Sequence, residues 1–308
     1  MLLGGRVQAD PDLKLPYEHQ TSIGIERGLR KDLSVQASYT LIRGFNQLRA
    51  RNLNAPDAFG ERPEPMVGTV TQIESTGRSH IDRLTLSSNF RIPQKRVLVT
   101  ANYTLSRVRN DGDNVLQLPA NSLDPDSEWG PGVQDVRHRL NLLINLMLPA
   151  SVRANITATA SSAPPYTVIT GHDDNSDGVS NDRPVGVGRN SARGSGRLDT
   201  TVRLTRGFTF GGVRQQAGGR GGAARQIQGG PVVAGPGQGP GGGPRPAGPG
   251  RGAAAPQRFG VDFYAQASNL LNHTNFLNYS GNLQSPFFAT PTSAGPARRI
   301  EVGMQFRF

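Results

Sequence analysis

The amino-acid sequence predicts an all-β fold, in which antiparallel strands cross a membrane as a portion of a β-barrel. Apolar and polar residues alternate with a period of two, in segments of about ten residues. Tight turns and long loops follow these segments alternately. No stretch approaches the roughly 20 apolar residues of a membrane-spanning helix, so a helical membrane protein is excluded.

The segment 81–92 shows the alternation most clearly. Its apolar residues are Leu84, Leu86, Phe90 and Ile92, and mainly polar residues stand between them. Successive side chains of a strand point to opposite faces, so one face is apolar and the other is polar. The pattern recurs at 23–25, 33–41, 97–105, 140–148, 152–159, 198–204, 261–265 and 300–308. The sequence therefore predicts about nine strands.

The connections between these segments fall into two groups. The tight turns are 30–32, 93–95 and 149–150, and the long loops are 46–76, 110–135, 164–196 and 272–297. A transmembrane barrel has this asymmetry, with short periplasmic turns and long extracellular loops. A soluble β-sandwich also alternates apolar and polar residues, but it has no reason to place every long connection on one side.

Composition sets further limits on function. Only 35% of the chain is hydrophobic, and it contains 39 Gly and 23 Pro, which is poor material for a packed soluble core. Cysteine is absent, which excludes disulfides, thiolate metal sites and cysteine nucleophiles. The net charge of +11 fits either a nucleic-acid partner or arginines that line a polar lumen and face anionic lipid heads.

The segment 211–257 divides the chain. It consists mainly of Gly, Pro, Arg, Ala and Gln, and is expected to be disordered because it cannot bury enough apolar surface. It is interpreted as an insertion into a periplasmic turn, between barrel strands with long extracellular loops in 1–210 and the last two strands in 258–308. Arg-Gly segments can bind RNA, but this one contains no aromatic residue, so no nucleic-acid partner is predicted.

The segment 172–184 carries oxygen-bearing side chains at the spacing of a calcium loop. The candidate ligands are Asp173, Asn175, Asp177 and Asp182, with Asn181 as an alternative to Asp182. Gly178 permits the sharp turn, but Pro184 stands where a calcium loop has a bidentate Glu. Calcium is thus the single cofactor that the sequence suggests, and the alternative is an acidic, turn-forming surface loop.

No residues show the spacing of catalytic groups. His138, His172 and His273 lack partners at metal or catalytic spacing, and the carboxylates of 124–128 are interpreted as a solvated loop. The chain is therefore not expected to be an enzyme.

The C-terminal run 297–308 ends an amphipathic strand with an aromatic residue. Phe306 and Phe308 share the apolar parity of the strand, and a terminal Phe in this position resembles the sorting signal that the outer-membrane barrel assembly machinery reads. The alternative is an ordinary amphipathic strand that ends in Phe.

Several motifs in order resemble one family. SNLLNHTNF at 268–276 resembles the penultimate-strand motif of TonB-dependent receptors, although Leu271 stands where Phe is frequent. The further matches are ASYTLIRG, RARNLNAP, ANYTLSR, EWGPGVQDVRHRLN and NYSGNLQSPFFATPTSAGPARRI. Together they resemble the barrels of Oar-like receptors with carboxypeptidase-regulatory-like N-terminal domains. The resemblance covers nearly everything except 211–257.

This resemblance implies a location and a function. Such receptors have a signal peptide, a small sandwich domain, a plug that carries the TonB box, and a barrel of roughly 22 strands. The sequence shows no signal peptide, plug or TonB box, so it is expected to be a C-terminal fragment of an outer-membrane transporter for nutrient uptake. Its implied partners are outer-membrane lipid, the barrel assembly machinery, an unknown nutrient and, only through the missing plug, TonB. A surface adhesion or scaffold protein and a soluble β-sandwich binding module remain the alternatives.

Overall fold

The computed structural model describes residues 4–210 and 259–308. They belong to two compact units, the first formed by Met1–Arg206 with Phe263–Gly303 and the second by Gly207–Asp262 with Met304–Phe308. The insertion predicted at 211–257 lies outside the described residues. Within the described ranges, no helix has the length and apolar character needed to cross a membrane.

Strands make up most of the described residues. They are β1 (Arg6–Ala9), β2 (Tyr17–Arg30), β3 (Leu33–Asn52), β4 (Val70–Ile92), β5 (Val97–Asn110), β6 (Gly130–Pro131), β7 (His138–Leu148), β8 (Val152–Ser161), β9 (Pro165–Tyr166), β10 (Ala192–Arg193), β11 (Arg197–Phe210), β12 (Phe259–Ser268), β13 (Phe276–Tyr279), β14 (Pro291–Ala294) and β15 (Arg299–Arg307). Three short 3-10 helices accompany them: η1 (Pro93–Lys95), η2 (Pro125–Glu128) and η3 (Pro149–Ser151).

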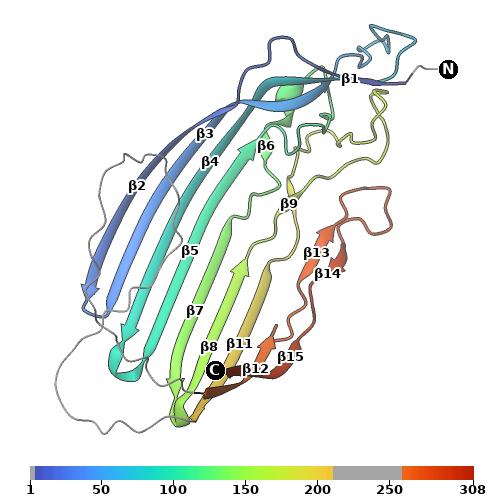
Figure 1. Cartoon of the computed structure of the whole chain (residues 1–308). Coiled ribbons are helices and arrows are strands. Elements are labelled where there is room, and N and C mark those ends of the chain that lie inside the picture. The colour runs from blue at the N-terminus through green and yellow to red at the C-terminus, as the bar shows by residue number, and fades with distance from the viewer. Residues whose placement is uncertain (1–3, 211–258) are drawn as a thin grey trace, which may run out of the picture. The chain divides into compact units, whose positions relative to one another are not determined.

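The main sheet follows the chain order, as a run of hairpins does. Its strand order is β15-β12-β11-β8-β7-β5-β4-β3-β2, while β1 pairs with β4 and β6 pairs with β5 beside this path. All nine strands that alternation predicts are present in this path, which confirms the antiparallel all-β prediction (Figure 1). β2 and β15 are edge strands, so the described sheet is open and forms a partial barrel.

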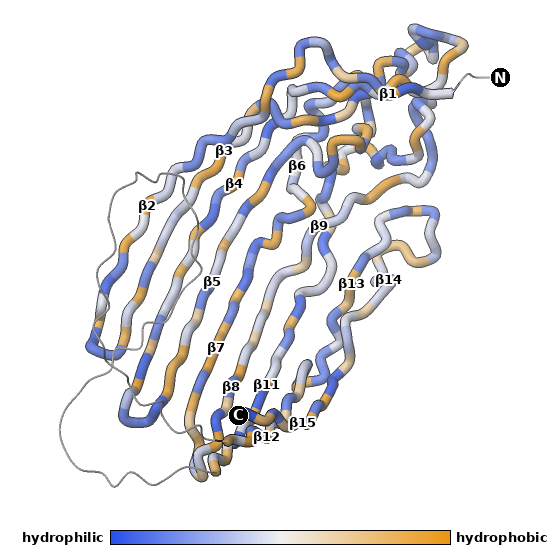
Figure 2. Tube along the Cα trace, viewed as in Figure 1, coloured by the Kyte–Doolittle hydropathy of each residue, from blue (hydrophilic) through white to orange (hydrophobic). Residues whose placement is uncertain are grey.

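The register of the sheet separates apolar from polar side chains across six strands. One cross-strand row consists of Leu33, Phe90, Val99, Ile144, Ile156 and Val202. A row of opposite parity consists of Gln36, Ser87, Asn102, Asn141, Thr159 and Asp199. We call the two sides the apolar face and the polar face. Figure 2 shows the alternation along the individual strands.

The apolar face changes character toward the loops. On β4 its large apolar side chains run from Leu84 to Ile92, close to the 9–11 residues that cross a bilayer. The next pairs toward the loops are Asp82 with Arg107 and His80 with Arg109. Apolar and charged rows therefore meet at this level, where we place the boundary between membrane and water.

An aromatic side chain marks the same boundary. Two guanidinium groups contact the Trp129 ring, with the Arg78 Cζ 4.9 Å and the Arg109 Cζ 5.2 Å from the ring centre. The ring of His80 meets it edge-on at 4.8 Å. Tryptophan is enriched at membrane interfaces because its ring is apolar and its N–H is polar.

The short and long connections lie at opposite ends of the strands, as predicted (Figure 1). The prediction for the first long loop is wrong in its bounds, because β3 extends to Asn52 and β4 begins at Val70, which leaves only 53–69 between them. Register shifts between Gly44 and Arg49 break the alternation while the hydrogen-bonded ladder continues. The period-two pattern therefore ends before the strands do.

Candidate ligand-facing loop cluster

Four long loops of the first unit gather at one end of the strands. They are 53–69, 111–137, 162–196 and 269–298. Asn175 Nδ2 in the third loop donates to the Ala120 carbonyl of the second at 2.7 Å. The rings of Tyr166 and Tyr279 stack at 5.8 Å and connect the third loop to the fourth. These contacts hold loops that are distant in sequence in one cluster.

The first loop is organised around one buried amide. Asn54 is 1% exposed, and its Nδ2 donates to the carbonyl oxygens of Glu64, Val67 and Gly68 at 2.9–3.0 Å. Its Oδ1 accepts the Glu64 N–H at 2.7 Å. The Asn54 side chain therefore supplies hydrogen-bond partners for backbone groups of residues 64–68, which lie outside the sheet.

Buried carboxylates lie mainly in the long loops and at the adjoining strand ends, and Asp262 on β12 is the exception. Those among the described residues are Glu74, Asp111, Glu128, Asp135, Asp177, Asp182 and Asp262. Within the same residues, all except Asp177 and Asp182 form an ion pair with arginine. The prediction of a solvated acidic loop at 124–128 is wrong for Glu128, which is 6% exposed because arginines of the third loop cover it.

Arg189 is the most extensively bonded of these arginines. Its side chain is 4% exposed, and it forms an ion pair with the Asp113 carboxylate and short contacts to the main-chain and side-chain oxygens of Asn110. Its Nε donates to the Glu128 carbonyl at 2.9 Å. One guanidinium group thus fixes the third loop to the second.

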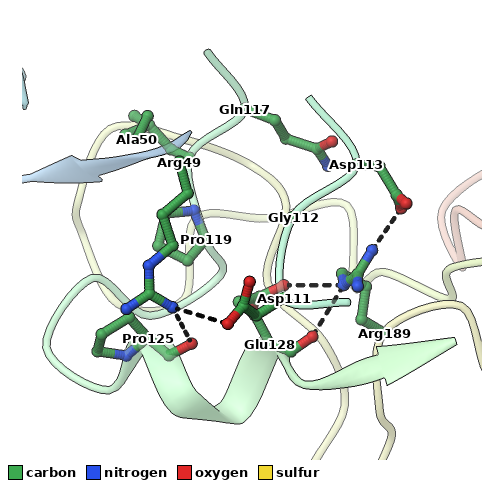
Figure 3. Close-up of a pocket in the computed structure, with 11 residues that line it drawn as sticks. Arg49, Ala50, Asp111, Gly112, Asp113, Gln117, Pro119, Pro125, Glu128 and Arg189 are labelled. Atoms are coloured by element: carbon green, nitrogen blue, oxygen red, sulfur yellow. Dashed lines mark hydrogen bonds and ion pairs between the residues drawn. The ribbon is translucent and has the colours of Figure 1, made fainter. Parts of the chain in front are cut away.

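A small cavity lies inside this network. Figure 3 shows Asp111 and Glu128 between Arg49 and Arg189. The cavity volume is about 20 Å³, which is room for about one water molecule. Burial raises the pKa of the Asp111 carboxyl, and the Arg78 N–H and the Arg49 guanidinium oppose this effect. The charges lining the cavity bind one another, so the cavity serves the packing of the loops.

An open groove of about 680 Å³ offers space for a solute. It is lined by residues of the first three loops, at 55–58, 60, 120–123, 174–177 and 182–187. Its volume falls within the range of small-molecule sites, and its walls carry carboxylate, amide and guanidinium groups. Polar hydrogen-bonding groups at the loop end of the sheet make this groove the candidate ligand-facing surface.

Three of the four residues predicted as calcium ligands, Asn175, Asp177 and Asp182, line this groove, and Asp173 is hydrogen-bonded to Asp177 in the same turn. Asp173 accepts the N–H groups of Asp177 and Gly178, and the amide oxygen of Asn175 also accepts the Asp177 N–H. Asp182 accepts the N–H groups of Asp174 and Asn175. The structure therefore brings the predicted residues into one compact turn.

The other predicted residues are placed as follows. Phe306 is 60% exposed and Phe308 is 94% exposed, with Phe308 one residue beyond the end of β15. His138 Nδ1 lies 2.7 Å from the Tyr103 hydroxyl on the apolar face.

Sequence reasoning missed the arginines of the network. Arg49, Arg183 and Arg189 stand in segments without periodicity, and their partners lie 25–79 residues away in sequence. The available signal was the joint enrichment of arginine and carboxylates in the long loops, which does not specify the pairing.

The fold resembles solved structures of outer-membrane transporters. The outer membrane transporter YddB from Escherichia coli matches with a TM-score of 0.56 at 12% identity, covering 96% of this chain and 33% of YddB. The FrpB iron transporter from Neisseria meningitidis matches with a TM-score of 0.50 at 10% identity, covering 97% of this chain and 32% of FrpB. The chain therefore spans about a third of the length of these transporters.

The sequence itself has a family match. No curated protein sequence matches the chain. The model of the outer membrane beta barrel domain, however, matches residues 4–301. Together with the open antiparallel sheet and its apolar face, this match places the protein in the outer membrane. The chain belongs to the outer membrane beta barrel domain family.

Proposed function

We propose that the chain forms part of the wall of a TonB-dependent receptor that imports a nutrient across the outer membrane. The observation that carries the proposal is the open sheet. Its edge strand β2 is exposed at every position from Tyr17 to Arg30, including Ile23 at 73% and Ile25 at 70%. A long exposed strand edge promotes aggregation, and a lipid bilayer does not tolerate its unpaired backbone groups.

Pairing with further strands removes this defect. In a closed barrel the free N–H and C=O groups of β2 and β15 would be paired, and the apolar face would meet lipid all around the wall. This chain covers only about a third of each of the two solved transporters, so about two thirds of each transporter lies outside the matched portion. The likeness in fold and the open edges therefore support a role as one portion of a larger transport barrel.

The loop cluster supplies the surface that a solute meets first. Its groove has polar walls, and the proposed role of these groups is to bind a solute without covalent chemistry. The nutrient contacts assigned to this chain come from the first three loops, while coupling to TonB requires a plug. The chain is therefore proposed to act as a non-enzymatic receptor wall.

Deletion of the coding sequence tests this function. Cells of the source organism are compared, with and without the gene, for energised accumulation of labelled ferric chelates, cobalamin, oligosaccharides and peptides. We expect the deletion to abolish accumulation of one class and a protonophore to have the same effect in parent cells. If uptake of every class is unchanged while attachment to surfaces falls, the adhesion or scaffold alternative replaces the proposal.

The C-terminal residue is proposed to guide assembly. Deleting Phe308 is expected to lower the amount of heat-modifiable, protease-resistant chain in outer-membrane fractions by at least about tenfold, because the assembly machinery would lose its terminal aromatic residue. Gln305→Ala is the matched control, since Gln305 has the opposite parity on β15. Equal amounts of the deletion variant and the parent would contradict an assembly signal at Phe308.

A further inference from the structure

The loop 162–196 contains carboxylates that no arginine or lysine of the described residues neutralises. Asp177 is 1% exposed and Asp182 is 7% exposed, and neither has an ion-pair partner there, in contrast to the other buried carboxylates. Burial raises the pKa of Asp177, and the charges of Asp173 and Asp182 raise it further. A buried charge without a counter-charge is costly, so this loop favours an external cation.

Two oxygen atoms of the loop are buried without any hydrogen-bond donor. They are Asp177 Oδ2 and Asn181 Oδ1. The other polar atom of each side chain is engaged, because Asp177 Oδ1 accepts the Val179 N–H at 2.9 Å and Asn181 Nδ2 donates to the Leu118 carbonyl at 2.9 Å. Buried acceptors almost always have partners, so these two free oxygens point to a positively charged ligand.

The backbone holds the carboxylates near one another. Asp173 Oδ1 accepts the Asp177 N–H and Asp173 Oδ2 accepts the Gly178 N–H, each at 2.9 Å. Gly178 has a φ of 94°, where a side chain would be strained. The turn therefore keeps Asp173 close to Asp177 without consuming Asp177 Oδ2.

We propose that this turn binds one calcium ion through Asp177 Oδ2 and Asn181 Oδ1, with Asp173 and Asp182 providing further negative charge. In the described part of the chain, no three His, Cys, Asp or Glu side chains stand together as a metal site, so the donor set is a mixed one. Calcium accepts carboxylate, amide and main-chain oxygens and water in a flexible shell. Zinc prefers histidine nitrogen and cysteine sulfur, and residues 173–182 contain neither His nor Cys.

Calcium bound here would act on the whole loop cluster. Asn52 Nδ2 donates to the Asp177 carbonyl at 3.3 Å, and Asn181 is bonded to the second loop through Leu118. Asp177 and Asp182 also line the open groove. The ion would therefore fix the groove wall in place, and this role does not depend on whether the barrel transports a nutrient.

Calcium titration of the full chain tests the site. The chain is purified with a chelator, exchanged into chelator-free detergent micelles, and studied by calorimetry with calcium chloride and by limited proteolysis of the loop 162–196. We expect one site per chain with a Kd of about 0.1–1 mM, typical of extracellular calcium modules, and at least about tenfold slower cleavage. Equal protection by the same concentration of magnesium chloride, or no binding heat, would overturn the proposal.

Asp177→Asn separates a ligand role from a structural role. The variant keeps an oxygen for the Val179 N–H but loses the charge, so we expect calcium affinity to fall at least about 100-fold. Without calcium its loop should be cleaved no faster than that of the parent, because an uncompensated charge is gone. Asp174→Asn is the matched control, since Asp174 is exposed in the same turn, and it should change the affinity less than about threefold. Unchanged affinity of Asp177→Asn, or faster cleavage of this variant in chelator, would refute Asp177 as a ligand.

Discussion

Ile144→Arg is expected to destabilise the membrane-inserted chain by about 2–4 kcal/mol, the cost of an arginine facing lipid near the middle of a bilayer. Ile144 stands in the cross-strand apolar row between Val99 and Ile156. Its side chain would face acyl chains, where a guanidinium group has no partner. A urea titration of outer-membrane fractions that contain the chain, followed by protease protection, measures this cost.

The adjacent residue gives the control. Asn145→Arg adds the same charge one position along β7, on the polar face between Leu98 and Asn155. Its expected cost is below about 1 kcal/mol, because water reaches this face. Equal costs at the two positions would mean that both faces are solvated, and would contradict a lipid-facing apolar face on this sheet.

The strands could be predicted because their signal is local. The parity of Leu84, Leu86 and Phe90 along one segment is sufficient to predict a strand and its two faces. In the hairpins β2–β3, β4–β5 and β7–β8 the cross-strand partners then follow from the tight turn, which sets the register. The β3 and β4 extensions escaped prediction because the register shifts near Gln47 destroy the parity while the strands continue.

The candidate site could be predicted only in part. The proposed calcium loop has its candidate oxygen donors within one short segment, so Asp173 and Asp177 could be named as candidates from spacing alone. The free oxygen of Asn181 depends on a contact with Leu118 in another loop, which no local pattern encodes. The ion pairs of Arg49 and Arg189 could not be predicted for the same reason. The packing of the whole cluster decides which residues pair across the long loops.

Arg189→Met is expected to loosen the contact between the second and third loops by about 3–5 kcal/mol, the usual cost of removing one partner of a buried ion pair. The variant leaves the Asp113 carboxylate without its arginine and removes the Nε bond to the Glu128 carbonyl. Amide hydrogen exchange of the full chain in detergent should therefore accelerate at least about 100-fold in 111–137 and 162–196. The strands, in contrast, should keep their protection.

Two further variants decide whether the bonding geometry of Arg189 matters. Arg189→Lys keeps the charge but cannot bridge Asp113, Asn110 and the Glu128 carbonyl at once, so its exchange rates should fall between those of the parent and Arg189→Met. Arg298→Met removes an exposed guanidinium group of the fourth loop and should leave the rates unchanged. If Arg189→Lys exchanges like the parent, charge alone holds the loops together. If Arg189→Met does so as well, the cluster is maintained by its remaining contacts, and Arg189 does not fix the third loop to the second.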